Sequence, residues 1–386
     1  MRILIVTRNL PPLVGGMERL NWHMAEELAR IADVRIVGPE GSAALAPVGI
    51  EVREAPLKPL WKFLWRARSL ARSEACRWRP DIVLAGSGLT APLARHAARA
   101  CGARTAAYIH GLDVAVKHPV YRAVWLPAIR RMDRVIANSR ATAELCSGVG
   151  IDSSRTGVVY PGVDMPSNKP VADGGGGDLG ADHDFRAKHG FAGQTLLLSV
   201  GRLSARKGLR EFVTHCLPRI VAAHPGVMLL VVGDTPNQAL HAEAQSSSSI
   251  QAAADAAGVG KCVQFLGKIP DEELLRLYRT ADVHVFPIRM IAGDPEGFGM
   301  VAVEAAAHGL PTVAFANGGV VDAVAEGVSG HLVAPDDYAV FAETVLKTLG
   351  ERGLLHESCI DFARGFAWPA FGASIAKQLA AVDRGP

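Results

Sequence analysis

The chain has 386 residues, and its 41 lysines and arginines against 38 aspartates and glutamates give a net charge of +3. The composition, 49% apolar and 20% charged, argues against a disordered chain, and the small charge excess argues against a nucleic-acid partner. At roughly 100–200 residues per domain, the length predicts two domains.

The cysteines and the N-terminus indicate the compartment. The six cysteines are scattered singly, with no Cys-x-x-Cys pair, which argues against a zinc ribbon and against a secreted disulfide framework. The first residues, MRILIVTRNL, lack the basic stretch and the cleavage site of a signal peptide and predict a buried strand instead. No apolar run reaches the roughly 18 residues of a membrane span. We therefore expect a cytoplasmic protein.

Apolar runs alternate with helical patterns through the first half of the chain. Helices are predicted at residues 18–30 and 58–78. Strands are predicted at residues 3–7, 34–37, 82–85, 104–109, 134–137 and 157–159. Because strands of this kind are apolar on both faces, they indicate a parallel sheet that is covered by helices on both sides.

The alternation stops at residues 166–184, which read PSNKPVADGGGGDLGADHD and contain almost nothing apolar. A structureless stretch of this length is unusual inside one compact domain, so it predicts a linker or a mobile loop. We expect an N-terminal domain at residues 1–168, a linker at 169–189 and a C-terminal domain at 190–366. A final helix at about residues 367–386 is expected to cross back to the N-terminal domain.

After this segment the alternation restarts. Strands are predicted at residues 195–200, 227–232, 263–266, 283–287 and 312–315. Helices are predicted at residues 209–223, 238–257, 271–280, 300–308 and 337–349, with the serines at 246–249 weakening the middle of the second one. The whole chain thus predicts an α/β protein with two tandem, doubly wound, Rossmann-like domains. Neither half carries Gly-x-Gly-x-x-Gly after its first strand, which argues against a dinucleotide fold.

Two glycine-containing loops follow predicted strands, where ligands of open α/β sheets bind. Gly15 and Gly16 let backbone N–H groups approach an anion at the start of the next helix, although a glycine pair alone is more often a plain turn. Gly201 and Arg202 are followed by Lys207, and two cations that leave one loop suit a diphosphate. Taken alone, such cations are more often solvated surface residues.

Two acidic residues flank a glycine-rich turn in DPEGFGMVAVE, residues 294–304. Glu296 stands in the loop, where a carboxylate can hold sugar hydroxyls, and Glu304 can accept two hydrogen bonds from a ribose diol. The alternative for Glu304 is a surface or capping residue, but its apolar neighbours indicate a buried helix in which a lone glutamate needs a partner. His110 directly follows a strand, which suits a cleft position and a structural role equally well.

Taken together, these segments resemble the retaining, nucleotide-sugar-dependent glycosyltransferases of family 4, which have the GT-B fold of two Rossmann-like domains facing a cleft. The resemblance spans nearly the whole chain, and the two glutamates separated by seven residues, with their glycines, are its most specific part. The segments that carry it are Gly15-Gly16-x-Glu18, His110 with Asp113, Asn138-Ser139, residues 160–164, residues 199–202 with Lys207-Gly208, residues 296–305, residues 309–313 and Gly318-Gly319.

The resemblance implies a role for each matching residue. Arg202 and Lys207 would neutralise the donor diphosphate, and Glu296 would hold hydroxyls of the transferred sugar. Glu304 would bind the ribose diol, and His110 would face the reacting centre. The other donor-binding residues would be Gly15, Gly16 and Gly201 at the diphosphate, Phe298, Gly299, Met300 and Val301 with N–H groups toward sugar and phosphate, and Gly267, Lys268 and Ile269 beside the base.

The reaction implied by the resemblance is transfer of a hexose, with retention of configuration, from a UDP- or GDP-linked sugar to a glycan or lipid-linked acceptor in polysaccharide, lipopolysaccharide or glycolipid biosynthesis. Fixed cations and helix dipoles can stabilise the leaving group, and no Asp-x-Asp pair appears in the cleft segments, so no metal and no further cofactor are expected. No carboxylate stands out for a double displacement, which favours front-face attack. One family pattern, Gly-x-Gly-Pro, is replaced by Gly233-Asp234-Thr235-Pro236, and residues 289–293 have no assigned role.

Residues 57–80 form a basic segment with interleaved aromatic residues. Its basic residues are Lys58, Lys62, Arg66, Arg68, Arg72, Arg77 and Arg79, and its one acidic residue is Glu74. Its aromatic residues are Trp61, Phe63, Trp65 and Trp78. Such a helix suits an interface with anionic lipid, and the alternative is an ordinary covering helix with a solvated basic face. Peripheral contact with the inner face of the cytoplasmic membrane would fit a lipid-linked acceptor that enters on the side of the N-terminal domain.

Two other classes of protein share these phosphate-binding loops. The first is an enzyme of another class on the same fold, a nucleotide-sugar epimerase or a phosphorylase; an epimerase would turn over its donor without an acceptor. The second is a nucleotide-sugar binding protein that has lost catalysis, which would form a complex without turnover. The presence of His110, Arg202, Lys207, Glu296 and Glu304 argues against this second class.

Overall fold

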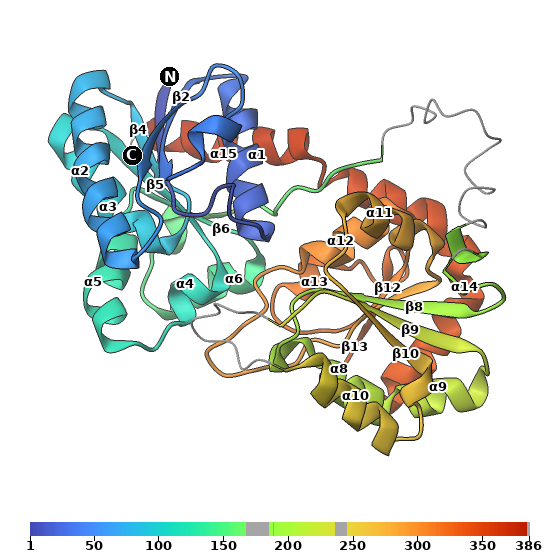
Figure 1. Cartoon of the computed structure of the whole chain (residues 1–386). Coiled ribbons are helices and arrows are strands. Elements are labelled where there is room, and N and C mark those ends of the chain that lie inside the picture. The colour runs from blue at the N-terminus through green and yellow to red at the C-terminus, as the bar shows by residue number, and fades with distance from the viewer. Residues whose placement is uncertain (167–184, 188, 236–244, 384–386) are drawn as a thin grey trace, which may run out of the picture. The chain divides into compact units, whose positions relative to one another are not determined.

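The computed structural model describes residues 1–166, 185–187, 189–235 and 245–383 (Figure 1). Most of the predicted linker at residues 169–189, and the first part of the helix predicted at residues 238–257, lie outside these ranges. The chain divides into two compact units. We call residues 1–162 with 368–386 unit 1, and residues 163–367 unit 2.

Unit 1 is built on a sheet of seven parallel strands in the order β3-β2-β1-β4-β5-β6-β7. The chain runs from β1 outward to β3, then crosses to β4 and continues in the opposite direction, so the order reverses between β1 and β4. This is the doubly wound arrangement that the alternating sequence predicts. The strands are β1 (Arg2–Val6), β2 (Asp33–Pro39), β3 (Glu51–Ala55), β4 (Ile82–Ala85), β5 (Arg104–Ile109), β6 (Arg134–Ala137) and β7 (Thr156–Val158).

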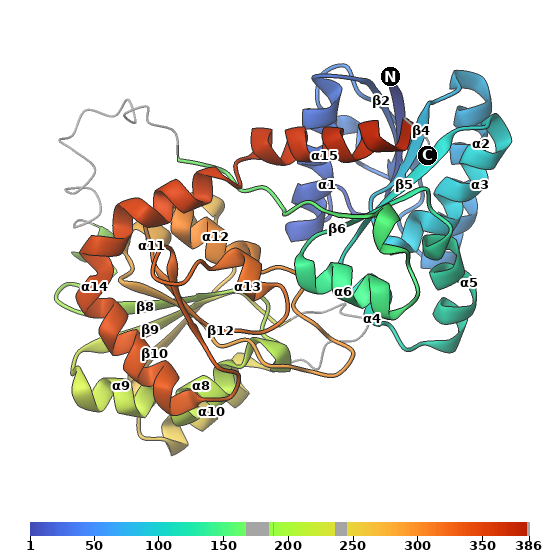
Figure 2. The same ribbon diagram turned by 180° about the vertical axis from the view of Figure 1, so that it is seen from behind.

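Helices cover both faces of this sheet. One face carries α2, α3 and α5, and the other carries α1 and the C-terminal helix α15 (Figures 1 and 2). The helices of unit 1 are α1 (Gly16–Ala29), α2 (Leu60–Trp78), α3 (Ala91–Cys101), α4 (Gly111–Ala115), α5 (Pro119–Arg130), α6 (Arg140–Gly148) and α15 (Trp368–Asp383), with short 3-10 turns at Ala43–Leu45 (η1), Gly88–Thr90 (η2) and Ser153–Arg155 (η3).

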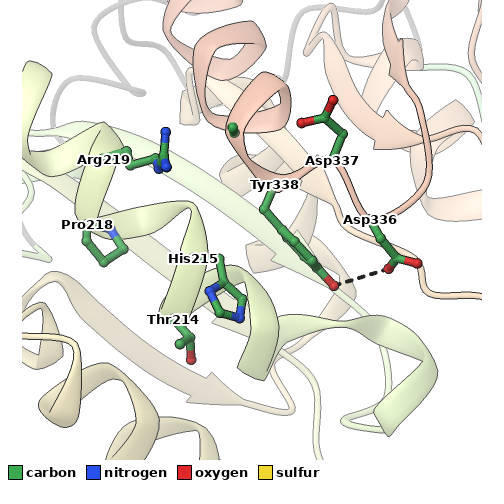
Figure 3. Close-up of a pocket in the computed structure, with 8 residues that line it drawn as sticks. Thr214, His215, Pro218, Arg219, Asp336, Asp337 and Tyr338 are labelled. Carbon is green, nitrogen blue, oxygen red and sulfur yellow. Dashed lines mark hydrogen bonds between the residues drawn. The ribbon is translucent and has the colours of Figure 1, made fainter.

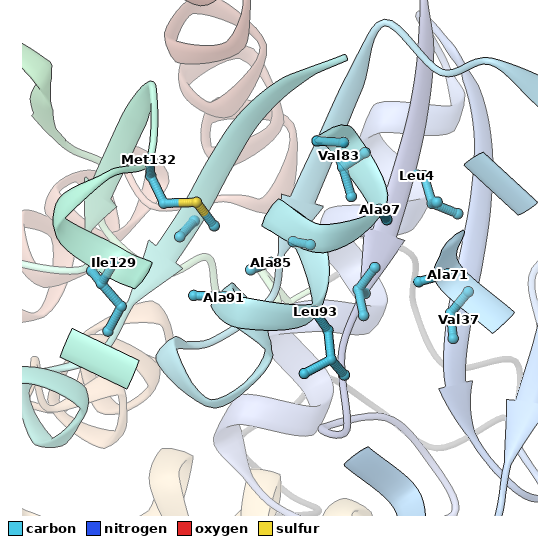
Figure 4. Close-up of a cluster of buried hydrophobic side chains, with 14 of the residues drawn as sticks. Leu4, Val37, Ala71, Val83, Ala85, Ala91, Leu93, Ala97, Ile129 and Met132 are labelled. Carbon is cyan, nitrogen blue, oxygen red and sulfur yellow. The ribbon is translucent and has the colours of Figure 1, made fainter. Parts of the chain in front are cut away.

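The core under α2 and α3 is built from aliphatic side chains of the sheet and small side chains of the helices (Figure 4). Ala67, Ala71 and Ala75 recur every four residues along α2 and are fully buried. Because alanines project so little, α2 can lie close against both the sheet and α3. Leu4 and Val83 fill the sheet side of the same cluster.

The C-terminal helix α15 belongs to unit 1 although it follows unit 2 in the sequence. Its Trp368 ring stacks on His23 of α1 at a centroid distance of 4.0 Å. Further along the helix, Gln378 Oε1 accepts a hydrogen bond of 2.9 Å from Nε of Arg134 on β6. Aromatic stacking on α1 and a hydrogen bond with a charged donor on β6 thus hold α15 on unit 1.

Unit 2 repeats the same design with six parallel strands in the order β10-β9-β8-β11-β12-β13. The strand order reverses between β8 and β11. The strands are β8 (Thr195–Val200), β9 (Val227–Val232), β10 (Val263–Gly267), β11 (Val283–Phe286), β12 (Thr312–Phe315) and β13 (Gly330–Val333). The helices are η4 (Ala205–Lys207), α8 (Leu209–His215), α9 (Leu217–Ala223), α10 (Ser247–Ala256), η5 (Gly260–Cys262), α11 (Asp271–Thr280), α12 (Met300–Ala307), α13 (Val320–Ala323) and α14 (Tyr338–Arg364).

Three predicted helices of unit 2 differ from the observed ones. The helix predicted at residues 209–223 is two helices, α8 and α9, because Pro218 lacks the N–H that would continue the first one. The serines near residue 246 do not weaken a helix but begin one, since Ser246 Oγ accepts a hydrogen bond of 3.1 Å from the backbone N–H of Ser249. The helix predicted at residues 337–349 continues to Arg364 as α14.

Two observed strands, β3 and β13, are missing from the predicted set. Both are edge strands. β3 reads EVREA and only its last residue is buried, so it carries no apolar run, and β13 has only four residues. Edge strands of globular proteins are often short or charged, which removes the signal on which the prediction depends.

Candidate active site

The reversal of strand order in unit 2 places two loops side by side at the carboxyl edge of its sheet. β8 and β11 are hydrogen-bonded neighbours, and the loops that follow them contain residues 201–208 and 287–299. In doubly wound sheets this switch point is where ligands bind. The fold therefore brings Lys207 of the first loop and Glu296 of the second together, as the sequence predicts for one site.

The two loops meet in a largely buried ionic cluster. Lys207 Nζ lies 2.9 Å from Glu296 Oε2, and Arg206 Nη1 pairs with the same oxygen. Arg206 Nε also lies 3.3 Å from Oδ1 of Asp294. Lys207 Nζ lies 4.6 Å from the centroid of the Phe286 ring, within the range of a cation–π interaction. The side chains of Arg206, Glu296 and Lys207 are only 9%, 12% and 15% exposed, so water screens these charges little.

The charges of the cluster stabilise one another. Burial raises the pKa of Glu296, but Lys207 and Arg206 outweigh this effect and hold the pKa of the carboxyl below its usual value. Burial lowers the pKa of Lys207, and the neighbouring carboxylate of Glu296 opposes that shift. The cluster therefore presents an ionised carboxylate beside two cations in a partly dehydrated loop pair.

The loop after β11 leads into the N-terminus of α12. Gly299 caps the helix with φ 96°, a left-handed conformation that glycine adopts without strain. The backbone N–H of Gly319 donates to the carbonyl of Glu296 at 3.0 Å, and a Cβ on Gly319 would lie 2.1 Å from the carbonyl oxygen of Gly297. Glycine is thus required for this close approach, which holds the N–H groups at the start of α12, Met300 and Val301 included, beside the ionic cluster.

Glu304 lies further along α12 and has an aromatic partner. The hydroxyl of Tyr278 on α11 donates to Glu304 Oε2 at 3.2 Å, and Tyr278 is 1% exposed. The ring of Tyr278 stacks on His308 at a centroid distance of 5.6 Å. A buried tyrosine thus orients the glutamate that the sequence assigns to a ribose diol, and the partner that a half-buried carboxylate needs is present.

Glycines join the carboxyl ends of the three neighbouring strands β8, β9 and β10. The N–H of Gly201 donates to Val232 at 2.9 Å, and the N–H of Gly233 donates to Gly267 at 2.8 Å. A Cβ on Gly233 would lie 1.9 Å from the carbonyl oxygen of Gly201, so the glycine of the unusual Gly233-Asp234-Thr235 segment is required by this contact. Arg202, Lys268 and Ile269 border the same edge, and Arg202 is exposed.

In unit 1, His110 caps α4 directly after β5. Its ring is hydrogen-bonded to the backbone of Gly86, whereas its Nε2 is buried and finds no partner among the residues that the structure describes. Burial lowers the pKa of His110, although Asp113 opposes the shift, so the imidazole is neutral at pH 7. A neutral ring with a free Nε2 can accept a hydrogen bond from a hydroxyl group.

Gly15 and Gly16 begin α1, as the sequence predicts for an anion-binding loop. The carboxylate of Glu18 already occupies this helix end: a Cβ on Gly15 would lie 2.4 Å from Glu18 Oε2. Asn9 Nδ2 holds the other oxygen of Glu18 at 2.8 Å. An acid in the first helical turn is favourable there, and the contact of this loop with a diphosphate stays a prediction.

Two residues of the ionic cluster, Arg206 and Asp294, are absent from the predicted set. Asp294 directly follows residues 289–293, which the sequence leaves without a role, and it is the first residue of the segment at residues 294–304. The backbone N–H of Arg289 donates to the carbonyl of Arg206 at 2.8 Å, which ties this segment to the loop after β8. The sequence gives no signal that assigns Arg206, because an arginine between Ala205 and Lys207 in a predicted site loop can turn inward as well as outward.

A separate pocket of about 530 Å³ opens where α8 and α9 face the start of α14 (Figure 3). Its lining residues are Thr214, His215, Pro218, Arg219, Asp336, Asp337, Tyr338 and Ala339. The Tyr338 hydroxyl donates to Oδ1 of Asp336, another lining residue, at 3.3 Å. None of the residues predicted for the donor site lines this pocket. Among the described residues, no three His, Cys, Asp or Glu side chains gather into a candidate metal site.

Acidification is expected to destabilise the fold through His284 and His308. Burial lowers the pKa of His284 to about 3 and that of His308 to about 4, against about 6.5 for an unfolded histidine. Between the folded and the unfolded pKa of each histidine, the unfolded chain binds a proton that the folded chain does not. The free energy of unfolding therefore decreases as the pH is lowered through this range, by about 1.4 kcal/mol per pH unit for each histidine. Urea unfolding at several pH values measures this slope, which His308→Gln should reduce; an unchanged slope contradicts the assignment.

Comparison with known families places both units. Residues 182–366 match the family described as glycosyl transferases group 1, and residues 14–165 match glycosyltransferase family 4. Two tandem doubly wound units of this kind define the GT-B class of glycosyltransferases. With family matches over both of its units, the chain belongs to glycosyltransferase family 4.

Similar proteins agree with this assignment. The D-inositol 3-phosphate glycosyltransferase of Mycolicibacterium smegmatis is 35% identical over 239 residues, which are 61% of this chain and 50% of that protein. The corresponding enzyme of Segniliparus rotundus is 32% identical over 268 residues, 67% of this chain and 54% of that protein. The chain thus spans about half the length of these curated relatives. Anabaena HepE in complex with UDP has the same fold, with a TM-score of 0.79 and 21% identity over 99% of this chain and 100% of that one.

Proposed function

We propose that this protein is a retaining glycosyltransferase that moves a hexose from a nucleoside diphosphate sugar to an acceptor without a metal ion. The observation that carries the proposal is the cluster of Lys207, Arg206 and Glu296 at the switch point of unit 2, beside the N-terminus of α12. Cations and free N–H groups suit a diphosphate, and an ionised carboxylate next to them suits sugar hydroxyls. The solved complexes of HepE with UDP and UDP-glucose support a donor of this class.

In the proposed reaction, Lys207 and Arg202 stabilise the charge that develops on the departing diphosphate. Glu296 fixes the sugar through Oε1, which makes no hydrogen bond with any residue that the structure describes. The acceptor oxygen bonds to the anomeric carbon on the face from which the phosphate oxygen leaves with its electron pair. The acceptor proton passes to that phosphate oxygen, so configuration is retained and no proton acceptor of the protein is needed.

A binding screen with UDP, GDP, ADP and their sugar conjugates in EDTA tests the donor site. Calorimetry and thermal shift are expected to select one nucleoside diphosphate. In the transfer reaction with an acceptor, NMR of the product should show the anomeric configuration of the donor. An inverted product, or an isolated covalent sugar–enzyme adduct, contradicts the mechanism. Turnover of the donor without an acceptor would favour an epimerase, and tight binding without any turnover would favour an inactive binding protein.

We propose a lipid-linked acceptor because of the exposed face of α2. Trp61 and Trp65 are 69% and 68% exposed, whereas the predicted interfacial residues Phe63 and Trp78 are buried in the core. Glu74, the one acid of residues 57–80, is also buried and pairs with Arg35, Arg53 and Arg77. The outer face of α2 is therefore basic and aromatic without a negative charge, which suits an anionic lipid surface.

The names of the curated relatives suggest a second acceptor class, a phosphorylated polyol such as D-inositol 3-phosphate. Assays with a glycolipid in anionic vesicles and with inositol phosphate in solution separate the two. Preferential transfer to the lipid supports the membrane acceptor, and equal or better transfer to inositol phosphate contradicts it. Among the described residues, no helix is long and apolar enough to cross a bilayer.

A further inference from the structure

Arg206 has the most buried side chain of the cations in the ionic cluster, at 9% exposed, and the sequence assigns no role to it. Its guanidinium lies between two carboxylates, those of Asp294 and Glu296. Its backbone carbonyl accepts the N–H of Arg289 at 2.8 Å, so the loop after β11 fixes it from a second side. An arginine held at both its backbone and its side chain loses little further entropy when it binds a carboxylate.

Arg206 and Lys207 contact the same oxygen of Glu296, Oε2. This arrangement satisfies Oε2 of Glu296 in the free protein, but it also occupies the lysine that the proposed function assigns to the diphosphate. When the Lys207 ammonium turns to a phosphate oxygen, its bond to Glu296 weakens or breaks. A carboxylate that is 12% exposed would then lose one of its two close cations without gaining water.

One neighbouring group can compensate Glu296 for the weakened contact with Lys207. The charged groups that face Glu296 are Lys207, Arg206 and Arg202, together with Asp294 through Arg206. Arg202 is exposed and leaves its loop toward solvent, so its charge is screened. Arg206 keeps its contact whatever Lys207 does, because Asp294 and the Arg289 backbone hold it in place.

We propose that Arg206 is a positioning residue that keeps Glu296 ionised and aimed at the donor sugar while Lys207 binds the diphosphate. Asp294 positions Arg206 in turn. This inference rests on the proposed function of the same site. The two adjacent cations then have separate roles: Lys207 stabilises the leaving diphosphate, and Arg206 stabilises and orients the carboxylate of Glu296.

The test compares Arg206→Gln and Arg206→Lys with Arg210→Gln, which removes an exposed arginine of α8 as a matched control. Arg206→Gln is expected to lower kcat/KM for the nucleotide sugar about tenfold and to move the acid limb of its pH profile up by about one unit. Affinity for the free nucleoside diphosphate should change less than about twofold, since that ligand has no sugar for Glu296 to hold. Arg206→Lys should restore most of the activity.

Other results would overturn the inference. If Arg206→Gln weakens nucleoside diphosphate and nucleotide sugar equally, with an unmoved pH profile, Arg206 has only a structural role. If Arg206→Gln does not fold, Asp294→Asn is measured instead, and it must lower kcat/KM for the nucleotide sugar while it leaves the affinity for the free nucleoside diphosphate within about twofold. A wild-type chain that binds no nucleoside diphosphate overturns the proposed function together with this inference, whereas normal turnover in Arg206→Gln overturns the inference alone.

Discussion

Lys207→Ala is expected to lower turnover by about tenfold or more while the fold survives. The variant removes the ammonium that the proposed function assigns to the diphosphate, and the loss of one fixed donor to a developing negative charge costs this much or more in other enzymes. Glu296 keeps Arg206 as a partner, so the buried carboxylate is not left uncompensated. Steady-state kinetics with the selected nucleotide sugar, alongside circular dichroism and thermal unfolding, measure both parts of the prediction.

Glu296→Ala is expected to reduce turnover to a similar extent, but it also affects stability. It leaves Lys207 and Arg206 largely buried with less negative charge nearby, which lowers the free energy of unfolding. Glu296→Gln is the better matched variant because it keeps the size and one hydrogen-bond acceptor while it removes the charge. Near-normal rates in Lys207→Ala or Glu296→Ala would refute the assignment of this cluster to the active site.

Buried strands account for most of what the sequence predicts correctly about the fold. The strands at residues 82–85, 104–109, 195–200, 227–232 and 312–315 match the observed β4, β5, β8, β9 and β12 residue for residue. Each is a nearly continuous apolar run because helices cover both faces of its sheet. The edge strands β3 and β13 lack this signal, and the length of α14 is hidden by Gly350 and Gly353, which are poor helix formers in isolation.

The candidate site could be predicted at the level of loops but not of all its side chains. Lys207 and Glu296 are recognisable because each stands at a strand-to-helix junction, and the strand order then makes these junctions neighbours. Arg206 could not be assigned, since the direction of a side chain in a 3-10 turn depends on the loop that packs against it. Asp294 depends on the same loop, whose path is held in part by the backbone contact between Arg289 and Arg206.

Replacing both exposed tryptophans of α2, as Trp61→Ser with Trp65→Ser, is expected to lower partition onto anionic vesicles at least about tenfold. The two indole rings are the large apolar groups of an otherwise basic helix face, and the core loses nothing because neither ring is buried. Leu354→Ser is the matched control, because its side chain is 83% exposed on α14, a helix of unit 2 that is not part of the proposed membrane face. Vesicle co-sedimentation measures all three proteins.

The charge of the same face provides the second half of this test. Lys58, Lys62, Arg66 and Arg72 are exposed and form no ion pair with any residue in the described part of the chain. Each basic residue near an anionic surface contributes about 1 kcal/mol, so binding should fall steeply with added salt and on vesicles without anionic lipid. Activity on an acceptor dissolved in water should be unaffected, because α2 supplies no residue of the proposed site. Equal vesicle binding by wild type and the double variant would show that α2 is an ordinary covering helix, and the lipid-linked acceptor would then lose its structural support.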